Sequence, residues 1–159
     1  MPALWKPSVT VAAVVERDGR FLMVEEETAD GVRLNQPAGH LDPGETLLHA
    51  ATRETLEETT HAFTPTALLG VYVARSVPNR DRDGVTYVRF AFTGDLGPDD
   101  PGRALDDGIL RVLWLAPDEI RQRADEHRSP LVMQCIDDYL AGRRFPLDFE
   151  YTHASALAA

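Results

Sequence analysis

The chain is poor in cysteine: Cys135 is the only one in 159 residues, so no disulfide can form within it. Cys135 lies in an apolar stretch with helical spacing, which is more typical of a small core residue than of a nucleophile. Stable disulfides belong to oxidising compartments, and a chain without one fits a reducing environment. We therefore expect a cytoplasmic protein.

Long apolar runs are also missing. Residues 1–8 contain a tryptophan, a lysine and two prolines but no apolar core of a secretory signal. The apolar run at residues 9–15 is too short to span a bilayer. The sequence predicts neither export nor a membrane partner.

Positive charge is scarce. The chain has 16 Lys and Arg residues against 26 Asp and Glu residues, a net charge of -10. Such a surface repels polyanions, which argues against nucleic acid as a partner. A small phosphorylated substrate would be repelled as well, and it would need a metal cation in order to enter a site.

The composition fits one folded unit, since 43% of the residues are hydrophobic and no linker rich in Pro, Gly or Ser divides the chain. We expect a single domain over residues 1–153, followed by a mobile alanine-rich end at residues 154–159. The sequence leaves open whether the chain is a monomer or a homodimer.

Acidic side chains continue the apolar stripe of a predicted helix. At helical spacing the stripe contains Leu47, Ala50, Ala51, Glu54 and Glu58, with Glu57 at its margin. Like charges at this spacing oppose each other by roughly 0.2 to 0.5 kcal/mol per pair. Arg53 can pair with one carboxylate, which leaves the others for a hard divalent cation such as Mg²⁺. The alternative is a solvated acidic helix end.

The segment before this helix, residues 35–46, contains two glycines and two prolines. These residues disfavour regular structure and predict a tight loop, with Thr46 as the helix N-cap. Such a loop can present backbone carbonyls, notably that of Gly39, to a cation held by the glutamates. Glu45 can reach back to Arg53 as a brace, so that loop and helix form one unit.

Together these residues resemble the Nudix box, in which a glycine, a glutamate, an Arg-Glu pair and a Glu-Glu pair recur at fixed spacing. The matching residues are Gly39, Glu45, Arg53, Glu54, Glu57 and Glu58. Several residue types must coincide at set intervals, so this match is far more specific than a lone glycine motif. The resemblance implies the Nudix fold, an α/β arrangement of the α+β kind with a mixed β-sheet sandwiched between helices.

The resemblance also implies a Mg²⁺-dependent hydrolase of phosphoanhydride bonds, in which Mn²⁺ can replace Mg²⁺. It implies that the catalytic positions are Glu45, Arg53, Glu54, Glu57 and Glu58, and that the metal is bound by Gly39, Glu54, Glu57 and Glu58. The chain departs from the family at Thr60 and His61, where a glycine and an apolar residue are usual. We therefore expect the helix to end differently or to run slightly longer than in the family.

The other elements follow from alternation, turn residues and caps. A hairpin is expected at residues 9–16 and 20–27, around Asp18-Gly19. Further expected elements are a short extended piece at 33–36, strands at 66–77, 85–94 and 109–115, loops at 78–84 and 95–107, a helix that opens at Pro117, and a helix capped by Ser129-Pro130 that stops at Gly142.

The resemblance reaches beyond the box to one phosphatase subgroup of the family. The matching segments are residues 6–7, 9–12, 21–22, 24–26, 36–41, 128–132 and 144–147, together with Tyr139 and Gly142. The subgroup implies release of orthophosphate from nucleoside tri- and diphosphates and from hydroxymethylpyrimidine pyrophosphate. One alternative is a pyrophosphohydrolase of ADP-ribose or a dinucleotide. Another is a non-catalytic nucleotide-binding regulatory domain.

Several residues outside the box are candidates for contact with a small phosphorylated substrate. Arg89 could meet a phosphate or form a surface ion pair, and His40 could contact substrate or hold the loop. Asp106 and Asp107 could supply a further acid by analogy with relatives, or be ordinary loop acids. Tyr72 and Tyr87 could stack on a base or pack within the fold.

Overall fold

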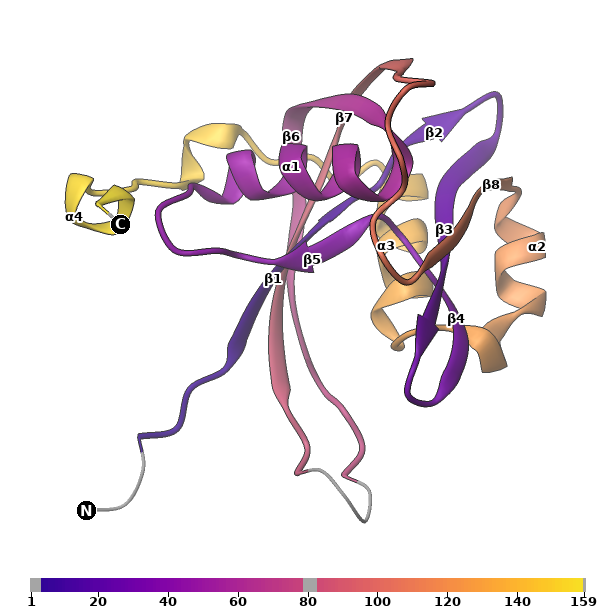
Figure 1. Ribbon diagram of the computed structural model, residues 1–159, viewed down its shortest axis with the longest axis horizontal. Helices are drawn as coiled ribbons and strands as arrows, with labels where there is room; N and C mark the ends of the chain where they lie inside the picture. Colours follow the sequence, from indigo (N-terminus) through magenta and orange to yellow (C-terminus); the bar gives the residue numbers. More distant parts are fainter. Residues whose placement is uncertain (1–3, 79–82, 159) are drawn as a thin grey trace.

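The computed structural model describes residues 4–78 and 83–158. Its strands are β1 (Ser8–Ala13), β2 (Glu16–Arg17), β3 (Arg20–Thr28), β4 (Gly31–Asn35), β5 (Ala38–His40), β6 (His61–Arg75), β7 (Thr86–Asp99) and β8 (Ile109–Leu115). The helices are α1 (Leu47–Thr59), α2 (Pro117–Gln122), α3 (Leu131–Leu140) and α4 (Ala154–Leu157), with short 3-10 turns at Ala124–Glu126 and Leu147–Phe149. Figure 1 shows their arrangement.

The strands form two sheets. The first has the order β5-β1-β7-β6 and is mixed, because β1 and β7 run parallel while the other neighbours are antiparallel. The second has the order β2-β3-β4, with β8 pairing antiparallel to β3. The predicted α+β class with a mixed sheet is confirmed, although the strands divide into two sheets.

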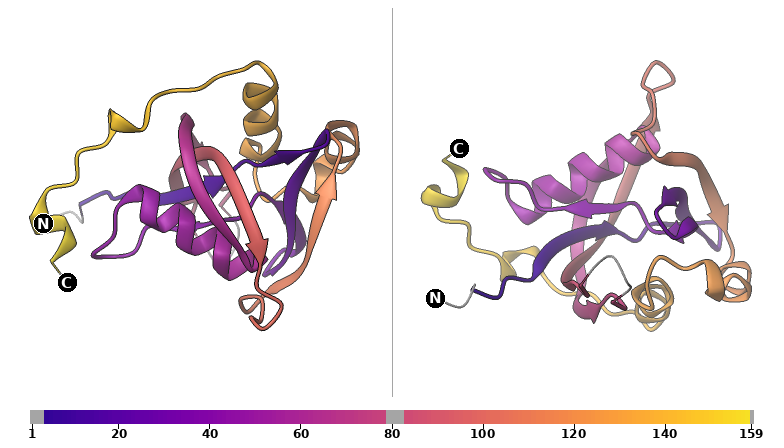
Figure 2. Two further views of the ribbon diagram at one scale, coloured as in Figure 1. Left: turned by 90° about the horizontal axis from the view of Figure 1, so that it is seen from above. Right: turned by 60° about the horizontal axis from the view of Figure 1, so that its bottom comes forward.

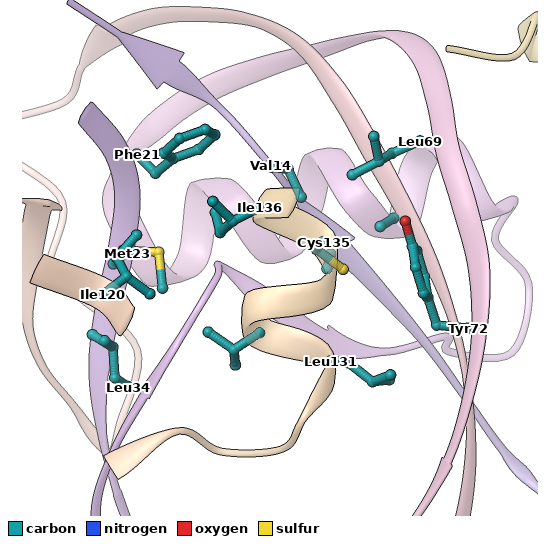
Figure 3. Close-up of a cluster of buried hydrophobic side chains, with 13 residues drawn as sticks. Val14, Phe21, Met23, Leu34, Leu69, Tyr72, Ile120, Leu131, Cys135 and Ile136 are labelled. Atoms are coloured by element: carbon teal, nitrogen blue, oxygen red, sulfur yellow. The ribbon is translucent and has the colours of Figure 1, made fainter. Parts of the chain in front are cut away.

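Alternation along β1 and just beyond it places a helix on each side of the first sheet. Ala12 and Val14 belong to the core cluster that contains α3, whereas Val11 and Ala13 belong to the cluster that contains α1. Figure 2 shows α1 and α3 on opposite sides of the strands, and Figure 3 shows the side chains of the α3 cluster. The sheet is therefore sandwiched between helices, as predicted.

The predicted hairpin is only partly correct. The turn at Asp18-Gly19 is present, with φ of 51° and 75°, and it pairs β2 with β3. However, β1 lies in the other sheet, between β5 and β7. The reason is burial: the apolar run from Val11 to Val14 is at most 1% exposed, as expected of a central strand covered on both faces.

The segment predicted as a loop before α1 contains a short strand, β5. Its residues pair with β1, and Val11 lies opposite Gly39. The prediction was wrong because Pro37 and Pro43 only flank this strand. The Pro37 carbonyl even accepts a hydrogen bond from Ala13 N–H at 2.9 Å. The sheet edge therefore positions the glycine that precedes the acidic helix.

The two long strands β6 and β7 extend further than predicted at one end, whereas residues 76–77 and 85, predicted as strand, lie outside them. Their ladder continues from Arg75 opposite Thr86 as far as His61 opposite Asp99, so residues 95–99 are strand and not loop. The pairing register shifts three times along β6, and Pro65 lies within it. Such irregularities break the alternation from which strand ends are predicted. Residues 79–82 of the predicted polar loop lie outside the described residues.

Helices α2 and α3 follow the prediction closely. Pro117 opens α2, and Ala116 N–H donates to the Glu119 carboxylate at 2.7 Å. Cys135 is buried in α3, where burial raises the pKa of its thiol to about 11, so it is a core residue. Leu140, the last residue of that helix, is 56% exposed. None of the helices in the described parts of the chain is both long and apolar enough to cross a membrane.

Candidate functional site

Helix α1 begins and ends at positions that its caps define. The Thr46 side chain accepts from His49 N–H at 3.1 Å, as predicted for the N-cap. At the other end Thr60 adopts φ of 62° and donates its N–H to the Leu56 carbonyl at 2.9 Å. The expectation of a different helix end was wrong, because Thr60 takes the left-handed conformation that a glycine usually provides.

Arg53 connects the loop to the helix. Its Nε and Nη2 donate to Glu45 at 3.0 and 2.7 Å, and Nη2 also reaches the His40 carbonyl at 3.0 Å. Its Nη1 donates to Glu54 at 2.8 Å and to Glu57 at 3.1 Å. The expected brace between Glu45 and Arg53 is present, and the Arg53 guanidinium holds the pKa of Glu45 below its ordinary value.

Glu54 lies directly against the glycine of the loop. A Cβ built on Gly39 would sit 2.0 Å from Glu54 Cδ and 2.1 and 2.2 Å from its two carboxylate oxygens. Only a residue without a side chain leaves room for the carboxylate there. Burial raises the pKa of Glu54, and the ion pair with Arg53 opposes that effect.

Glu58 is the most buried acid of the cluster, with 7% of its surface exposed. One oxygen accepts from Ala38 N–H in β5 at 2.9 Å. Burial is the largest cause of a pKa raised to about 9, and the negative charges of Glu26, Glu54 and Asp106 raise it further. A carboxyl so disfavoured as an anion marks a place where positive charge would be strongly stabilising.

The chemistry of the cluster suits a hard divalent cation. The one guanidinium of Arg53 faces four carboxylates, those of Asp42, Glu45, Glu54 and Glu57. One guanidinium cannot neutralise these acids and Glu58, and carboxylate oxygens are the ligands that Mg²⁺ prefers. Within residues 4–78 and 83–158, no three His, Cys, Asp or Glu side chains are already arranged as a metal cage. In this arrangement Glu54 and Glu57 are held by Arg53, with which a cation would have to compete.

A cavity of about 770 Å³ opens beside the cluster. It is lined on one side by Ala38, Gly39 and His40 from β5, and on the other by residues around the start of α3. This volume is in the usual range for small-molecule sites. The site thus combines an acidic helix face with room for an organic ligand.

Arg89 lies in the wall of this cavity and is 6% exposed. Its Nη1 donates to Gln36 Oε1 and its Nη2 to Asn35 Oδ1, both at 3.2 Å. A surface ion pair, one of the two interpretations of Arg89, is therefore wrong. Sequence reasoning did not identify the supporting roles of Asn35 and Gln36, because their contact with Arg89 spans more than fifty residues.

The two tyrosines have different surroundings. Tyr72 is 8% exposed in the α3 core cluster, and its hydroxyl donates to Asp138 Oδ2 at 2.8 Å. Tyr72 is therefore a packing residue and not a stacking platform (Figure 3). Tyr87 lines the cavity, with its ring centroid 6.3 Å from that of His40.

Of the two aspartates proposed as a further acid, the structure brings Asp106 to the cluster. Its N–H donates to the Glu57 carbonyl at 2.9 Å, and its charge contributes to the raised pKa of Glu58. Asp107 follows it in an exposed turn before β8. The backbone contact explains the proximity: it ties this turn to the end of α1.

Comparisons with known proteins agree with this geometry. The family model described as NUDIX domain matches residues 5–135. The chain is 39% identical over 145 residues to Phosphatase NudJ of Escherichia coli strain K12, with 91% of each chain covered. Its structure is similar to that of a NUDIX hydrolase from Nitrosomonas europaea, with a TM-score of 0.87, 50% identity, and 93% and 98% of the two chains covered.

A MutT NUDIX hydrolase from Burkholderia pseudomallei has a TM-score of 0.67 at 20% identity, with 84% and 98% of the two chains covered. At that identity the likeness shows the fold alone. The family model and the relatives of higher identity cover most of the chain, including the helix that carries the acidic cluster. The chain therefore belongs to the Nudix domain family and is a hydrolase that acts on acid anhydride bonds.

Proposed function

We propose that this Nudix hydrolase is a Mg²⁺-dependent phosphatase. Its proposed substrates are nucleoside tri- and diphosphates and the pyrophosphate ester of hydroxymethylpyrimidine, a thiamin precursor, from which it releases orthophosphate in the cytoplasm. The observation that carries this proposal is the relationship to Phosphatase NudJ. It covers 91% of each chain and therefore extends well beyond the box that Nudix proteins share.

The proposed metal site consists of the Glu54, Glu57 and Glu58 carboxylates and the Gly39 carbonyl. Support comes from the close approach of Glu54 to Gly39 and from the excess of carboxylates over guanidinium groups in the cluster. When bound, Mg²⁺ or Mn²⁺ neutralises phosphoryl oxygens and lowers the pKa of the attacking water. Glu45 and Arg53 hold the loop and the helix in register for that site.

The proposed substrate site is the adjoining cavity. Arg89 is held in its wall by two amide side chains and supplies a positive charge that a phosphate can meet in an otherwise acidic protein. His40 lies two strands away in the same sheet, next to Gly39, since Thr10 of β1 is opposite both His40 and Arg89. Asp106 is the proposed additional acid beside Glu58, with Asp107 as the neighbouring candidate.

The proposed reaction is attack of water on a terminal phosphorus, with loss of orthophosphate. A carboxylate of the cluster accepts the proton of the water, and Arg89 stabilises negative charge on the substrate. Both roles use groups that the fold already places at the cavity and at the adjoining helix face.

The test is product analysis with a nucleoside triphosphate and Mg²⁺. Orthophosphate and the nucleoside diphosphate as first products support the proposal. Pyrophosphate with a nucleoside monophosphate would contradict it, as would efficient cleavage of ADP-ribose into two organic monophosphates without orthophosphate. Complete absence of hydrolysis on all of these substrates would instead favour a non-catalytic regulatory domain.

A further inference from the structure

Glu26, on β3, presents an acidic group to the cavity that the box does not account for. Its side chain is 19% exposed and lines the cavity wall. Arg128 Nε lies 3.1 Å from Glu26 Oε1, and Asn35 Nδ2 donates to the same oxygen at 3.5 Å. Both protein contacts therefore converge on one oxygen of the carboxylate.

The orientation of this carboxylate is tied to that of Asn35. The Asn35 amide accepts from Arg89 through Oδ1, so its Nδ2 is the end that faces Glu26. This arrangement needs Glu26 to act as an acceptor. Among the described residues, Oε2 has no donor, and it remains available to accept a hydrogen bond from a ligand in the cavity.

Arg128 supplies hydrogen-bond donors next to the Glu26 carboxylate. Its backbone N–H donates to the Leu34 carbonyl at 2.9 Å, which anchors the segment before α3. Its Nε is used by Glu26, whereas its terminal amino groups have no partner within the described parts of the chain. The side chain is 44% exposed and lines the cavity. A free acceptor and free donors thus lie side by side in the wall.

An acceptor beside a donor is complementary to a ring edge with an exocyclic amine next to a ring nitrogen. The amine donates to the carboxylate, and the ring nitrogen accepts from the guanidinium. Cytosine, adenine and 4-aminopyrimidines present this edge. Their oxo counterparts, such as uracil and hypoxanthine, present a carbonyl next to a ring N–H, which is the opposite order.

We propose that Glu26 and Arg128 form a specificity site that selects phosphate esters of amino-substituted pyrimidine or purine rings over those of oxo-substituted rings. The inference rests on the proposed function for the position of the phosphates. Tyr87, Leu131 and Met133 supply apolar and aromatic surface for the ring faces in the same cavity. The carboxylate supplies the discrimination, because a carbonyl oxygen facing it would find no donor.

The experiment compares kcat/KM for two pairs of substrates, CTP with UTP and ATP with ITP, which differ in the amino or oxo group on the ring. A hydrogen bond to a charged group predicts a preference of about tenfold or more for the amino substrate. Glu26→Gln should lower both ratios to about one or below, because Asn35 and Arg128 hold the carbonyl oxygen of the amide and its NH2 group then faces the ring. Glu27→Gln is the matched control, since it is the same change at the exposed next residue of β3, and it should leave both ratios unchanged.

A second variant keeps the test decisive if Glu26→Gln folds poorly. Arg128→Met removes the donors from a partly exposed side chain but keeps its apolar stem, and it should also reduce both ratios. Equal loss of turnover on all four substrates with unchanged ratios would assign Glu26 to the chemistry or to folding, and would overturn the inference. Equal use of amino and oxo substrates by the wild-type enzyme would also overturn it.

Failure of the proposed function gives a different result. Orthophosphate and pyrophosphate are measured separately in the same reactions. The kcat/KM ratios of amino to oxo substrates can therefore be determined even if the enzyme cleaves at a different phosphorus from the one proposed. If none of the four substrates is hydrolysed, titration calorimetry with the α,β-methylene analogues of CDP and UDP replaces the kinetics. Tighter binding of the CDP analogue, lost in Glu26→Gln, supports the specificity site, and equal affinities overturn it.

Discussion

The Cα of Gly39 lies so close to the Glu54 carboxylate that a Cβ added to the glycine would be 2.0 Å from Glu54 Cδ. The glycine is held in β5 by pairing with Val11, and the glutamate is held on α1. The contact therefore connects the edge of the sheet to the acidic face of the helix. It explains physically why a glycine stands at this position of the box.

Gly39→Ala is expected to reduce activity by about tenfold or more, as disturbance of metal-site geometry commonly does. Stability should change little, because the atoms that the new methyl would meet are the end of a flexible side chain. Glu54 can swing away, but its carboxylate then leaves the cluster. Steady-state kinetics and thermal unfolding, measured on the same sample, check both expectations.

Two controls accompany this variant. Gly97→Ala adds the same methyl in β7, where the nearest side-chain atom would be Ala62 Cβ at 3.3 Å, and it should retain activity. Gly39→Ala made in a Glu54→Ala background should have no further effect on metal affinity, because the clashing carboxylate is already gone. An additional loss of affinity there would show that the methyl acts through something other than Glu54.

Glu57→Gln and Glu58→Gln should each lose most of the turnover while the protein stays folded. The amide keeps the shape of the side chain but removes the negative charge proposed to hold the cation. For Glu58 the folded state without metal should even be more stable as the amide, since burial disfavours the carboxylate and Gln can still accept from Ala38 N–H. Wild-type rates in both variants would show that these acids are not part of the site.

Removal of divalent metal should abolish hydrolysis, and Mg²⁺ or Mn²⁺ should restore it. The physical reason is that the acids crowded on one helix face, including the deeply buried Glu58, repel an anionic phosphate, and the Arg53 guanidinium that lies among them is already paired with carboxylates. The measurement is orthophosphate release after treatment with a chelator and after addition of excess metal. Unchanged activity under exhaustive chelation would contradict the metal site.

The sequence was most informative where local patterns decide the outcome. The N-cap at Thr46, the start of α2 at Pro117 and the brace between Glu45 and Arg53 all depend on residues within a few positions of each other. The family and fold class could also be predicted, because the box spacing is specific. Helical spacing alone was sufficient to predict that the glutamates lie on one face of the helix.

The rest depends on contacts between distant parts of the chain. The assignment of β1 to the centre of a sheet, the strand β5, and the buried Tyr72 are all determined by pairing or packing partners far away in sequence. The same is true of the polar wall made by Asn35, Glu26 and Arg89. The alternation of residues along a strand does not predict which of its faces will line a cavity.

Thr60→Gly is expected to stabilise the protein. Thr60 has φ of 62°, a left-handed conformation that costs a residue with a Cβ about 1 kcal/mol or more. Removing that strain should raise the Tm by about 2–4 °C for a chain of this size. The greater backbone entropy of glycine in the unfolded chain reduces this gain in Tm. Thr59→Gly is the contrasting control: its hydroxyl donates to the Thr55 carbonyl at 2.6 Å within the helix, so the Tm should fall. A lower Tm for Thr60→Gly would mean that the Thr60 side chain has a stabilising role larger than the strain.

Glu25→Gln should lower stability at neutral pH and matter less in acid. Glu25 is 5% exposed and accepts from Arg111 at 2.5 and 3.0 Å and from Arg123 at 2.6 Å. The hydrogen bond from Arg111 is the largest cause of a pKa held below the ordinary value of 4.5, and burial opposes it. Because the pKa is lower in the folded state, the stabilisation is complete above about pH 4.5 and is lost as the pH falls through the folded-state pKa.

The measurement is the Tm of the wild type and of Glu25→Gln across the acidic range. The wild type should unfold at the higher temperature at pH 7, and the gap between the two should narrow as the pH falls below 4.5. Glu27→Gln, at an exposed position of the same strand, controls for the loss of one negative charge and should show no such gap. A gap that stays constant with pH would mean that the amide is destabilising for steric reasons, and that the two arginines do not stabilise the ionised form of Glu25.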